Sequence, residues 1–199
     1  VRVTCLADAF AGNLEEEKLR RLVPGFRPEG IGTFTSFDAL LEAGPPDALY
    51  FCIPPGFHQG EVIRAARAGI HIFAEKPMSL YLDEAEEMNR AIRDAGVVSA
   101  VGFQKRYDAR NQAARAFLRD KRPVMVTLVS EGALEWHSVK HTRTAERGGP
   151  RDGAWAKNTA WSGTTVVEAG IHETDLMRFW FGDIAWVQAA YVERDPDDV

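Results

Sequence analysis

The sequence predicts an α/β protein with a Rossmann-type doubly wound parallel sheet, followed by part of an α+β domain. Three observations lead to this fold class. Short apolar runs alternate with helical patterns through the first half of the chain, and the run at 48–53 is apolar throughout, as in a parallel strand buried on both faces. The pattern then changes after Phe103. We therefore expect two partial domains, residues 1–103 and residues 104–199.

The elements of the first domain follow from apolar periodicity and from residues that end helices and strands. Ser36 is expected to cap a short helix that carries Leu40 and Leu41, and Gly69 and Gly96 are expected to end two longer helices. In chain order we expect a strand at 1–7, a helix near 37–43, a strand at 48–53, a helix near 58–68, a strand at 70–74, a helix near 82–95 and a strand at 97–103.

The second half has a different pattern. We expect a helix at 108–120, a strand at 124–130, a helix at 164–181 and a strand at 184–192. Between them lies the long polar stretch 131–162, and a stretch of that length in a compact domain usually has a function.

Composition excludes several classes of partner. The chain has 24 basic and 29 acidic residues and a net charge of -5, with no cluster of Lys and Arg, so nucleic-acid binding is disfavoured. No apolar run approaches the roughly 18 residues of a membrane helix. Cys5 and Cys52 lie singly in apolar runs and are expected to be buried and reduced, which favours a cytoplasmic location.

Asp8 directly follows the first expected strand. In dinucleotide-binding folds an acidic residue at the end of the second strand binds the adenosine ribose, although a turn Asp at a strand end is an equal alternative. No Arg follows to bind a 2′-phosphate, so NAD is favoured over NADP.

A glycine-rich phosphate loop should precede such an Asp, yet the sequence contains no G-x-G-x-x-G. Either the protein binds no dinucleotide or the chain lacks its first strand and loop, and we favour the second interpretation. The strand order 3-2-1-4-5-6 places strand 1 in the middle of the sheet. Its loss would leave two unpaired inner edges and an unstable, inactive chain.

Two groups of polar residues are candidates for catalysis. Lys76 follows the buried strand 70–74, so it lies at the edge of the sheet where ligands bind, although an exposed Lys at a strand end is the commoner case. Glu168, His172 and Asp175 have the spacing i, i+4 and i+7 and would share one face of a helix. A buried polar network, a catalytic group and a metal site remain open for them.

Other residues give weaker signals. Arg106 could bind a substrate hydroxyl or carboxylate, or be a surface Arg. Trp155 and Trp161 could stack on a sugar but are more typical of a core. His137 and His141 are four apart without further ligands in register, so we predict no metal site.

An ordered set of motifs resembles the Gfo/Idh/MocA family of sugar and polyol dehydrogenases. The set runs from Ile53-Pro54-Pro55-Gly56-Phe57-His58 through the Ala-rich helix to Glu75-Lys76-Pro77, and then to Val101-Gly102-Phe103-Gln104-Lys105-Arg106-Tyr107. Glu168, Gly170, His172 and Asp175 match a signature of the Asp-x-Gly-x-His-x-x-Asp type, with Glu in place of the first Asp. The resemblance covers nearly the whole chain.

The resemblance implies an NAD-dependent dehydrogenase that acts on CH-OH groups of a sugar or cyclitol. It implies His172 as the acid/base, Lys76 as the residue that stabilises the developing alkoxide, and Glu168 as a third catalytic residue. Arg106, Glu168 and Asp175 are expected to contact the substrate. The residues expected to bind the cofactor are Asp8, Ile53, Pro54, Pro55, His58, Glu75, Lys76 and Gln104.

The resemblance also implies a homo-oligomer at full length, because in this family the C-terminal sheet commonly provides the interface. Two other functions stay open. One is a glycosidase of the same fold that uses tightly held NAD, and the other is a non-catalytic protein that senses sugars or dinucleotides. Neither a membrane nor a nucleic acid is expected as a partner.

Overall fold

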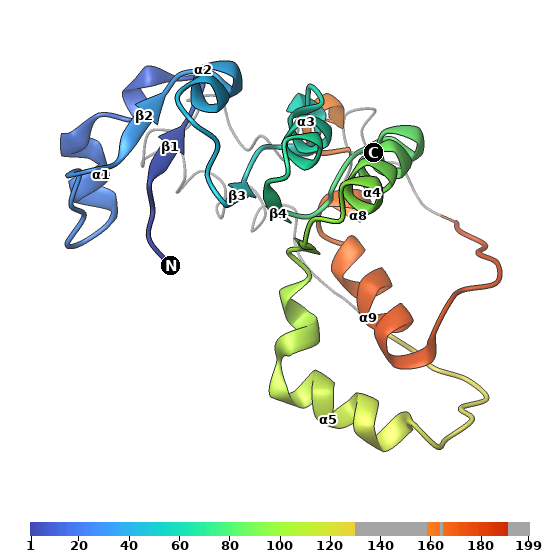
Figure 1. The fold of residues 1–199 in the computed structure, drawn as a ribbon. Coiled ribbons are helices and arrows are strands. Elements are labelled where there is room, and N and C mark those ends of the chain that lie inside the picture. The colour runs from blue at the N-terminus through green and yellow to red at the C-terminus, as the bar shows by residue number, and fades with distance from the viewer. Residues whose placement is uncertain (130–158, 164, 191–199) are drawn as a thin grey trace.

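The computed structural model describes residues 1–129, 159–163 and 165–190. Two small parallel sheets and their helices form the first half, and helices α5 and α9 lie side by side below them (Figure 1). The first half contains β1 (Cys5–Ala7), η1 (Ala11–Asn13), α1 (Glu16–Leu22), β2 (Gly32–Phe34), α2 (Phe37–Glu42), β3 (Ala48–Phe51), η2 (Pro55–Phe57), α3 (Glu61–Arg67), β4 (His71–Ala74), α4 (Leu82–Ala95) and β5 (Ser99–Val101).

The strands pair in the pattern that a Rossmann order predicts. Strand β1 pairs with β2, and β3, β4 and β5 pair in that order, with every pair parallel. These two groups correspond to 3-2 and 4-5-6 of the order 3-2-1-4-5-6. In the part of the chain that the structure describes, no strand joins β1 to β3, so each keeps one unpaired edge. The α/β fold class is confirmed.

Capping residues in the sequence correctly predicted the start of α2 and the ends of α3 and α4. The Ser36 hydroxyl accepts a hydrogen bond from the backbone N–H of Ala39 and so caps α2. Gly69 and Gly96 follow α3 and α4 with φ of 77° and 65°, a left-handed conformation that favours glycine. The helix α1 and the strand β2 were not among the expected elements.

The main core lies between the three-stranded sheet and the helices α3 and α4. Its side chains include Val62 and Ala66 from α3, Met88 and Ile92 from α4, and Ile72 from β4, all of which are buried. Because these helices pack on each other and on the sheet, they fix the strand ends that carry the candidate site.

One expectation about this sheet is wrong. The run at 48–53 was expected to be buried on both faces, but Tyr50 on β3 is 71% exposed. The described helices α3 and α4 cover the face that carries Phe51 and Ile72, whereas Tyr50 stacks on Phe73 with ring centroids 4.8 Å apart. Cys52, expected to be buried, is exposed, and both cysteines are free.

The second half begins with η3 (Gln104–Tyr107) and α5 (Ala109–Leu118) and continues with α7 (Thr159–Ser162), α8 (Thr165–Glu168) and α9 (Ile171–Phe181). The expected helix 164–181 is therefore two helices. Gly170 lies between them, and a Cβ there would come within 2.5 Å of the Val166 carbonyl oxygen. The close approach of these turns requires a glycine. The domain boundary at Phe103 stays a prediction.

Two expected strands do not form. Residues 124–129 and 184–190 are irregular, and Ser130 and 191–192 lie outside the described residues. A strand needs a hydrogen-bonded neighbour, and these segments have none among the residues described. Val124 and Trp186 are accordingly exposed. The α+β character of this half stays a prediction.

Within the described parts of the chain, no helix has the length and apolar character needed to cross a membrane.

The packing predicts a contrast between two substitutions in α4. Met88 is fully buried and Leu82 is 77% exposed. Met88→Ala should lower the free energy of unfolding by about 2–5 kcal/mol, because it removes buried contacts and leaves a cavity. Leu82→Ala, in the same helix, should change it by less than about 0.5 kcal/mol. Urea unfolding of both variants measures the difference, and equal effects would contradict this packing.

Candidate active site at the carboxyl edge of the sheet

The candidate site lies where β3, β4 and β5 end. Because the three strands are parallel and adjacent, their carboxyl ends meet at one edge. Strand β3 is followed by Pro54 and η2, β4 by Glu75 and Lys76, and β5 by η3. The Lys76–Pro77 peptide bond is cis.

Lys76 and Glu168 form a nearly buried ion pair. The ammonium of Lys76 donates to the Oε1 of Glu168 at 2.7 Å and to the main-chain carbonyl of the same residue at 2.8 Å. The two side chains are 13% and 10% exposed. Such a pair is held by geometry and by extra hydrogen bonds, since removing either partner leaves a charge in a site with little water. The pair therefore fixes α8 against the end of β4.

His172 lies in the first turn of α9, next to this pair. Its Nδ1 is buried and has no hydrogen-bond partner among the described residues. The imidazole ring and the ring of Phe103 are nearly perpendicular, at 87°, with ring centroids 6.5 Å apart. Burial lowers the pKa of His172 below its usual 6.5, and the positive charge of Lys76 lowers it further. The imidazole is thus uncharged near neutral pH and can accept a proton.

Two more ion pairs join η3 to α9. Lys105 donates to Glu173 at 2.5 Å, and Arg106 donates to both carboxylate oxygens of Asp175 at 2.7 and 2.5 Å. The hydrogen bond with Asp175 raises the pKa of Arg106. Asp175 is 6% exposed, so the carboxylate of this bidentate ion pair is largely shielded from water.

Arg106 and Asp175, both expected to contact substrate, thus bind each other. The guanidinium of Arg106 also lies 5.4 Å from the ring centroid of Phe179. These contacts hold the loop after β5 against α9. A direct contact of either residue with substrate stays a prediction.

The short helix α7 packs closely on η2. A Cβ on Gly56 would collide with the Ala160 carbonyl oxygen and lie 2.7 Å from the Cα of Trp161. The ring centroids of Phe57 and Trp161 are 5.0 Å apart. Only glycine allows this approach, so the loop after β3 is joined to the segment that leads to Glu168. Trp161 packs there against an aromatic ring, and Trp155 lies outside the described residues.

The other residues expected to bind the cofactor lie at strand ends in both sheets. Asp8 follows β1, and its carboxylate accepts hydrogen bonds from the Phe10 N–H and the Asn13 side chain, each at 2.8 Å. The Glu75 carboxylate lies over Gly102, where a Cβ would be 3.0 Å from its Oε2. Gln104 is exposed, Ile53 and Pro54 are half-buried and Pro55 is buried.

His58 follows η2, and its side chain is only 3% exposed. Its Nδ1 is 3.7 Å from Glu61 and has no hydrogen-bond partner in the described part of the protein. The structure therefore brings Lys76, Glu168 and His172 together, whereas Asp8 lies on the two-stranded sheet.

Sequence reasoning missed Lys105, Glu173 and Phe103 as parts of this site. Lys105 stands immediately before Arg106, and only Arg106 was expected to contact substrate. Glu173 lies off the helical face that carries His172 and Asp175, so the spacing i, i+4, i+7 does not include it. Its position directly after His172 in the sequence was the one indication that Glu173 belongs to the site.

The described residues hold no group of three or more His, Cys, Asp or Glu side chains that could bind a metal ion. His137 and His141 lie outside them.

Residues 13–103 match the sequence profile of a family described as "Oxidoreductase family, NAD-binding Rossmann fold". Two curated relatives are similar over most of the chain. The scyllo-inositol 2-dehydrogenase (NAD(+)) of Bacillus subtilis is 26% identical over 91% of this chain and 46% of its own length. The D-glucoside 3-dehydrogenase of Escherichia coli is 30% identical over 72% of this chain and 38% of its own length.

A solved structure has the same fold. The scyllo-inositol dehydrogenase of Lactobacillus casei with bound NAD(H) and scyllo-inositol superimposes with a TM-score of 0.65 and 20% identity, over 91% of this chain and 48% of that protein. This chain thus spans less than half the length of these relatives.

The contact between η2 and α7 gives a second prediction. Gly56→Ala should displace α7 and lower the free energy of unfolding by about 1–3 kcal/mol, because the added methyl group meets backbone atoms that cannot move aside. Hydrogen exchange of residues 159–163 should become faster. Gly12→Ala is a matched control, since its new methyl group would meet only the ring of exposed Phe10. Unchanged exchange in Gly56→Ala would contradict the contact.

Proposed function

Because this chain belongs to the Gfo/Idh/MocA family of oxidoreductases, we propose that the natural protein transfers a hydride between the nicotinamide of NAD and a carbon that bears a hydroxyl group. The substrate is a sugar or a cyclitol. The names of relatives that act on scyllo-inositol and on glucosides support this class. The observation that carries the proposal is the buried Nδ1 of His172, which has no hydrogen-bond partner in the described part of the chain and lies in the field of the Lys76 ammonium.

The residues present fit a dinucleotide. His58 places a buried ring nitrogen in the loop after β3, and among the described residues this nitrogen makes no hydrogen bond, although Glu61 lies 3.7 Å away. Each carboxylate oxygen of Asp8 accepts one hydrogen bond and has capacity for another, from a ribose hydroxyl. We assign the cofactor to the carboxyl edge, in contact with Asp8, Ile53, Pro54, Pro55, His58, Glu75, Lys76 and Gln104. When bound, the nicotinamide takes up or returns the hydride.

Lys76 orients the substrate. Its ammonium has three N–H donors, and the structure shows two of them used by Glu168. The third can donate to the hydroxyl oxygen of the substrate and stabilise the negative charge that develops there as the proton leaves. The Glu168 carboxylate fixes the direction of this ammonium.

His172 moves the proton. An uncharged imidazole accepts the proton of the substrate hydroxyl in oxidation and returns it in reduction. A hydroxyl at this point would also satisfy the buried Nδ1, which has no partner among the described residues. The ring of Phe103 is the aromatic neighbour of the imidazole, with centroids 6.5 Å apart.

We further propose a homo-oligomer in the cytoplasm for the full-length protein, with NAD preferred over NADP. The absence of an Arg directly after Asp8 supports the cofactor preference.

The first test uses the natural full-length protein. NAD and NADP are titrated calorimetrically, and NADH formation is followed with a panel of sugars and inositols. NAD should bind more tightly, and at least one polyol should be oxidised. His172→Ala should lower kcat by about 10²–10⁴-fold with the affinity for NAD retained, because it removes the proton acceptor and not the nucleotide site.

Failure of both nucleotides to bind to the folded full-length protein would refute the proposal. Turnover of an activated glycoside without added NAD would instead favour the glycosidase.

The lowered pKa of His172 predicts the pH dependence. The active form is the uncharged imidazole, so kcat/KM should fall on the acidic side only at a pH below 6.5. The same shift affects stability, because folding lowers the pKa of His172. Its contribution to the free energy of unfolding is present above pH 6.5 and is lost as the pH falls through the pKa of the folded state. A pH–rate profile checks the first point, and an acidic limb above 6.5 would contradict it.

A further inference from the structure

A second cation lies close to the proton acceptor of this site. Lys105 in η3 binds Glu173, the residue directly after His172 in α9, at 2.5 Å. The two side chains are 38% and 26% exposed, so the pair lies at the border between the site and solvent. No role in the proposed reaction uses either residue.

Charged groups from four elements influence the pKa of His172. Lys76 comes from the end of β4, Glu168 from α8, Lys105 from η3 and Glu173 from α9 itself. Burial is the main cause of the lowered pKa of His172; both lysines lower it further, and both carboxylates raise it. In each of the two ion pairs, the lysine and the carboxylate therefore shift the pKa of His172 in opposite directions.

The remaining element packed on α9 contributes no charge at this point. Helix α5 meets α9 through the carbonyl of Asn111, which accepts a hydrogen bond from the Trp180 Nε1 at 3.1 Å, and through Arg115, whose guanidinium lies 4.4 Å from the ring centroid of Phe179. Arg106 is engaged by Asp175 through both of its carboxylate oxygens. The balance at His172 therefore depends on Lys76 with Glu168 and on Lys105 with Glu173.

We propose that Lys105 and Glu173 are positioning residues whose ion pair anchors the first turn of α9 and keeps the imidazole of His172 ready to accept a proton. While they remain paired, their opposite charges act in opposite directions on the imidazole, so the pair changes the proton affinity of His172 less than either charge alone would. Loss of either partner leaves the other charge unopposed beside His172. The part that concerns catalysis rests on the proposed function.

The experiment compares three variants of the natural full-length protein: Lys105→Met, Glu173→Gln and the double variant. Lys105→Met should move the acidic limb of kcat/KM to higher pH, because the Glu173 carboxylate then favours the imidazolium. Glu173→Gln should move the limb to lower pH. Each shift should be about half a pH unit, which is about a threefold change in activity on the limb. The double variant should return close to the wild-type profile.

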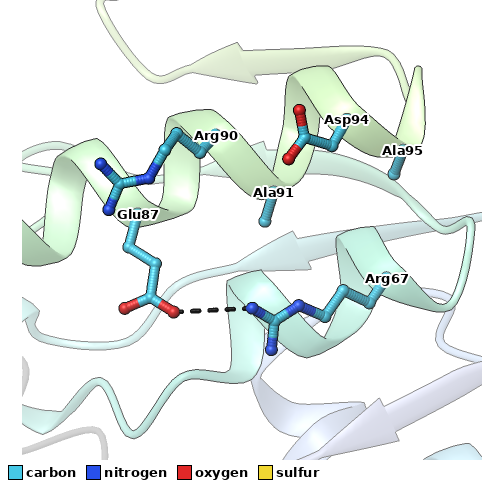
Figure 2. Close-up of a pocket in the computed structure, with 6 residues that line it drawn as sticks. All are labelled: Arg67, Glu87, Arg90, Ala91, Asp94 and Ala95. Atoms are coloured by element: carbon cyan, nitrogen blue, oxygen red, sulfur yellow. Dashed lines mark ion pairs between the residues drawn. The ribbon is translucent and has the colours of Figure 1, made fainter.

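A matched control is an ion pair remote from the edge. Arg67 near the end of α3 and Glu87 in α4 are 3.6 Å apart and exposed, across a groove of about 440 Å³ (Figure 2). This groove lies on the helices and involves no residue of the site. Arg67→Gln and Glu87→Gln should leave the acidic limb unchanged.

A direct readout separates this inference from the proposed function. Titration of His172 in the full-length protein by NMR with ¹³C-labelled histidine, assigned with His172→Ala, needs no turnover. Midpoints that move in opposite directions in the two single variants would support the pair even if no substrate were found. Midpoints that do not move, or that move in the same direction, would overturn it, because a purely structural role predicts no difference in sign.

Discussion

The ion pair between Lys76 and Glu168 is the contact on which the rest of the site depends. It joins the end of β4 to a helix 92 residues later in the chain, with both side chains nearly buried. A charge in such a place is costly without its partner, so the pair permits few other positions of α8. Helix α9 follows α8 directly, and His172 in its first turn is therefore placed by the same contact.

Three ion pairs with different exposure hold α8 and α9 in place, one to the end of β4 and two to η3. The Lys76 pair is nearly buried, the Arg106–Asp175 pair is buried on its acidic side, and the Lys105–Glu173 pair is partly open to solvent. Because the last pair is the most exposed, its contribution to stability is the most screened. Lys105 and Glu173 nevertheless act on the pKa of His172, because they lie close to it. The close approach of Gly56 to α7 adds a fourth connection that carries no charge.

Much of the first half could be predicted from the sequence because local signals specify it. Ser36 caps α2, glycines end α3 and α4, and short apolar runs form the strands. The pairing of the described strands as β1-β2 and β3-β4-β5 agrees with the strand order expected from the sequence. The exposure of Tyr50 could not be predicted in this way, because it depends on which sheet face the described helices cover. The same holds for 124–129 and 184–190, whose apolar pattern suits a strand but finds no partner among the described residues.

The sequence singled out some residues of the candidate site but not the contacts between them. Lys76, Glu168 and His172 do lie together, yet Glu168 is on α8 and not on one continuous helix with His172. The pairing of Arg106 with Asp175, and the presence of Lys105 and Glu173, depend on contacts between η3 and α9 that no spacing along the chain reveals. Long-range ion pairs of this kind require the fold.

The central claim is that Lys76 and His172 together bind the hydroxyl group that reacts. A crystal structure of the full-length protein with NAD and a bound inositol or sugar tests it most directly. The account predicts one substrate oxygen within hydrogen-bonding distance of both the Lys76 ammonium and a ring nitrogen of His172, with Glu168 still paired to Lys76. A substrate bound elsewhere, with the imidazole of His172 still lacking a partner, would contradict it.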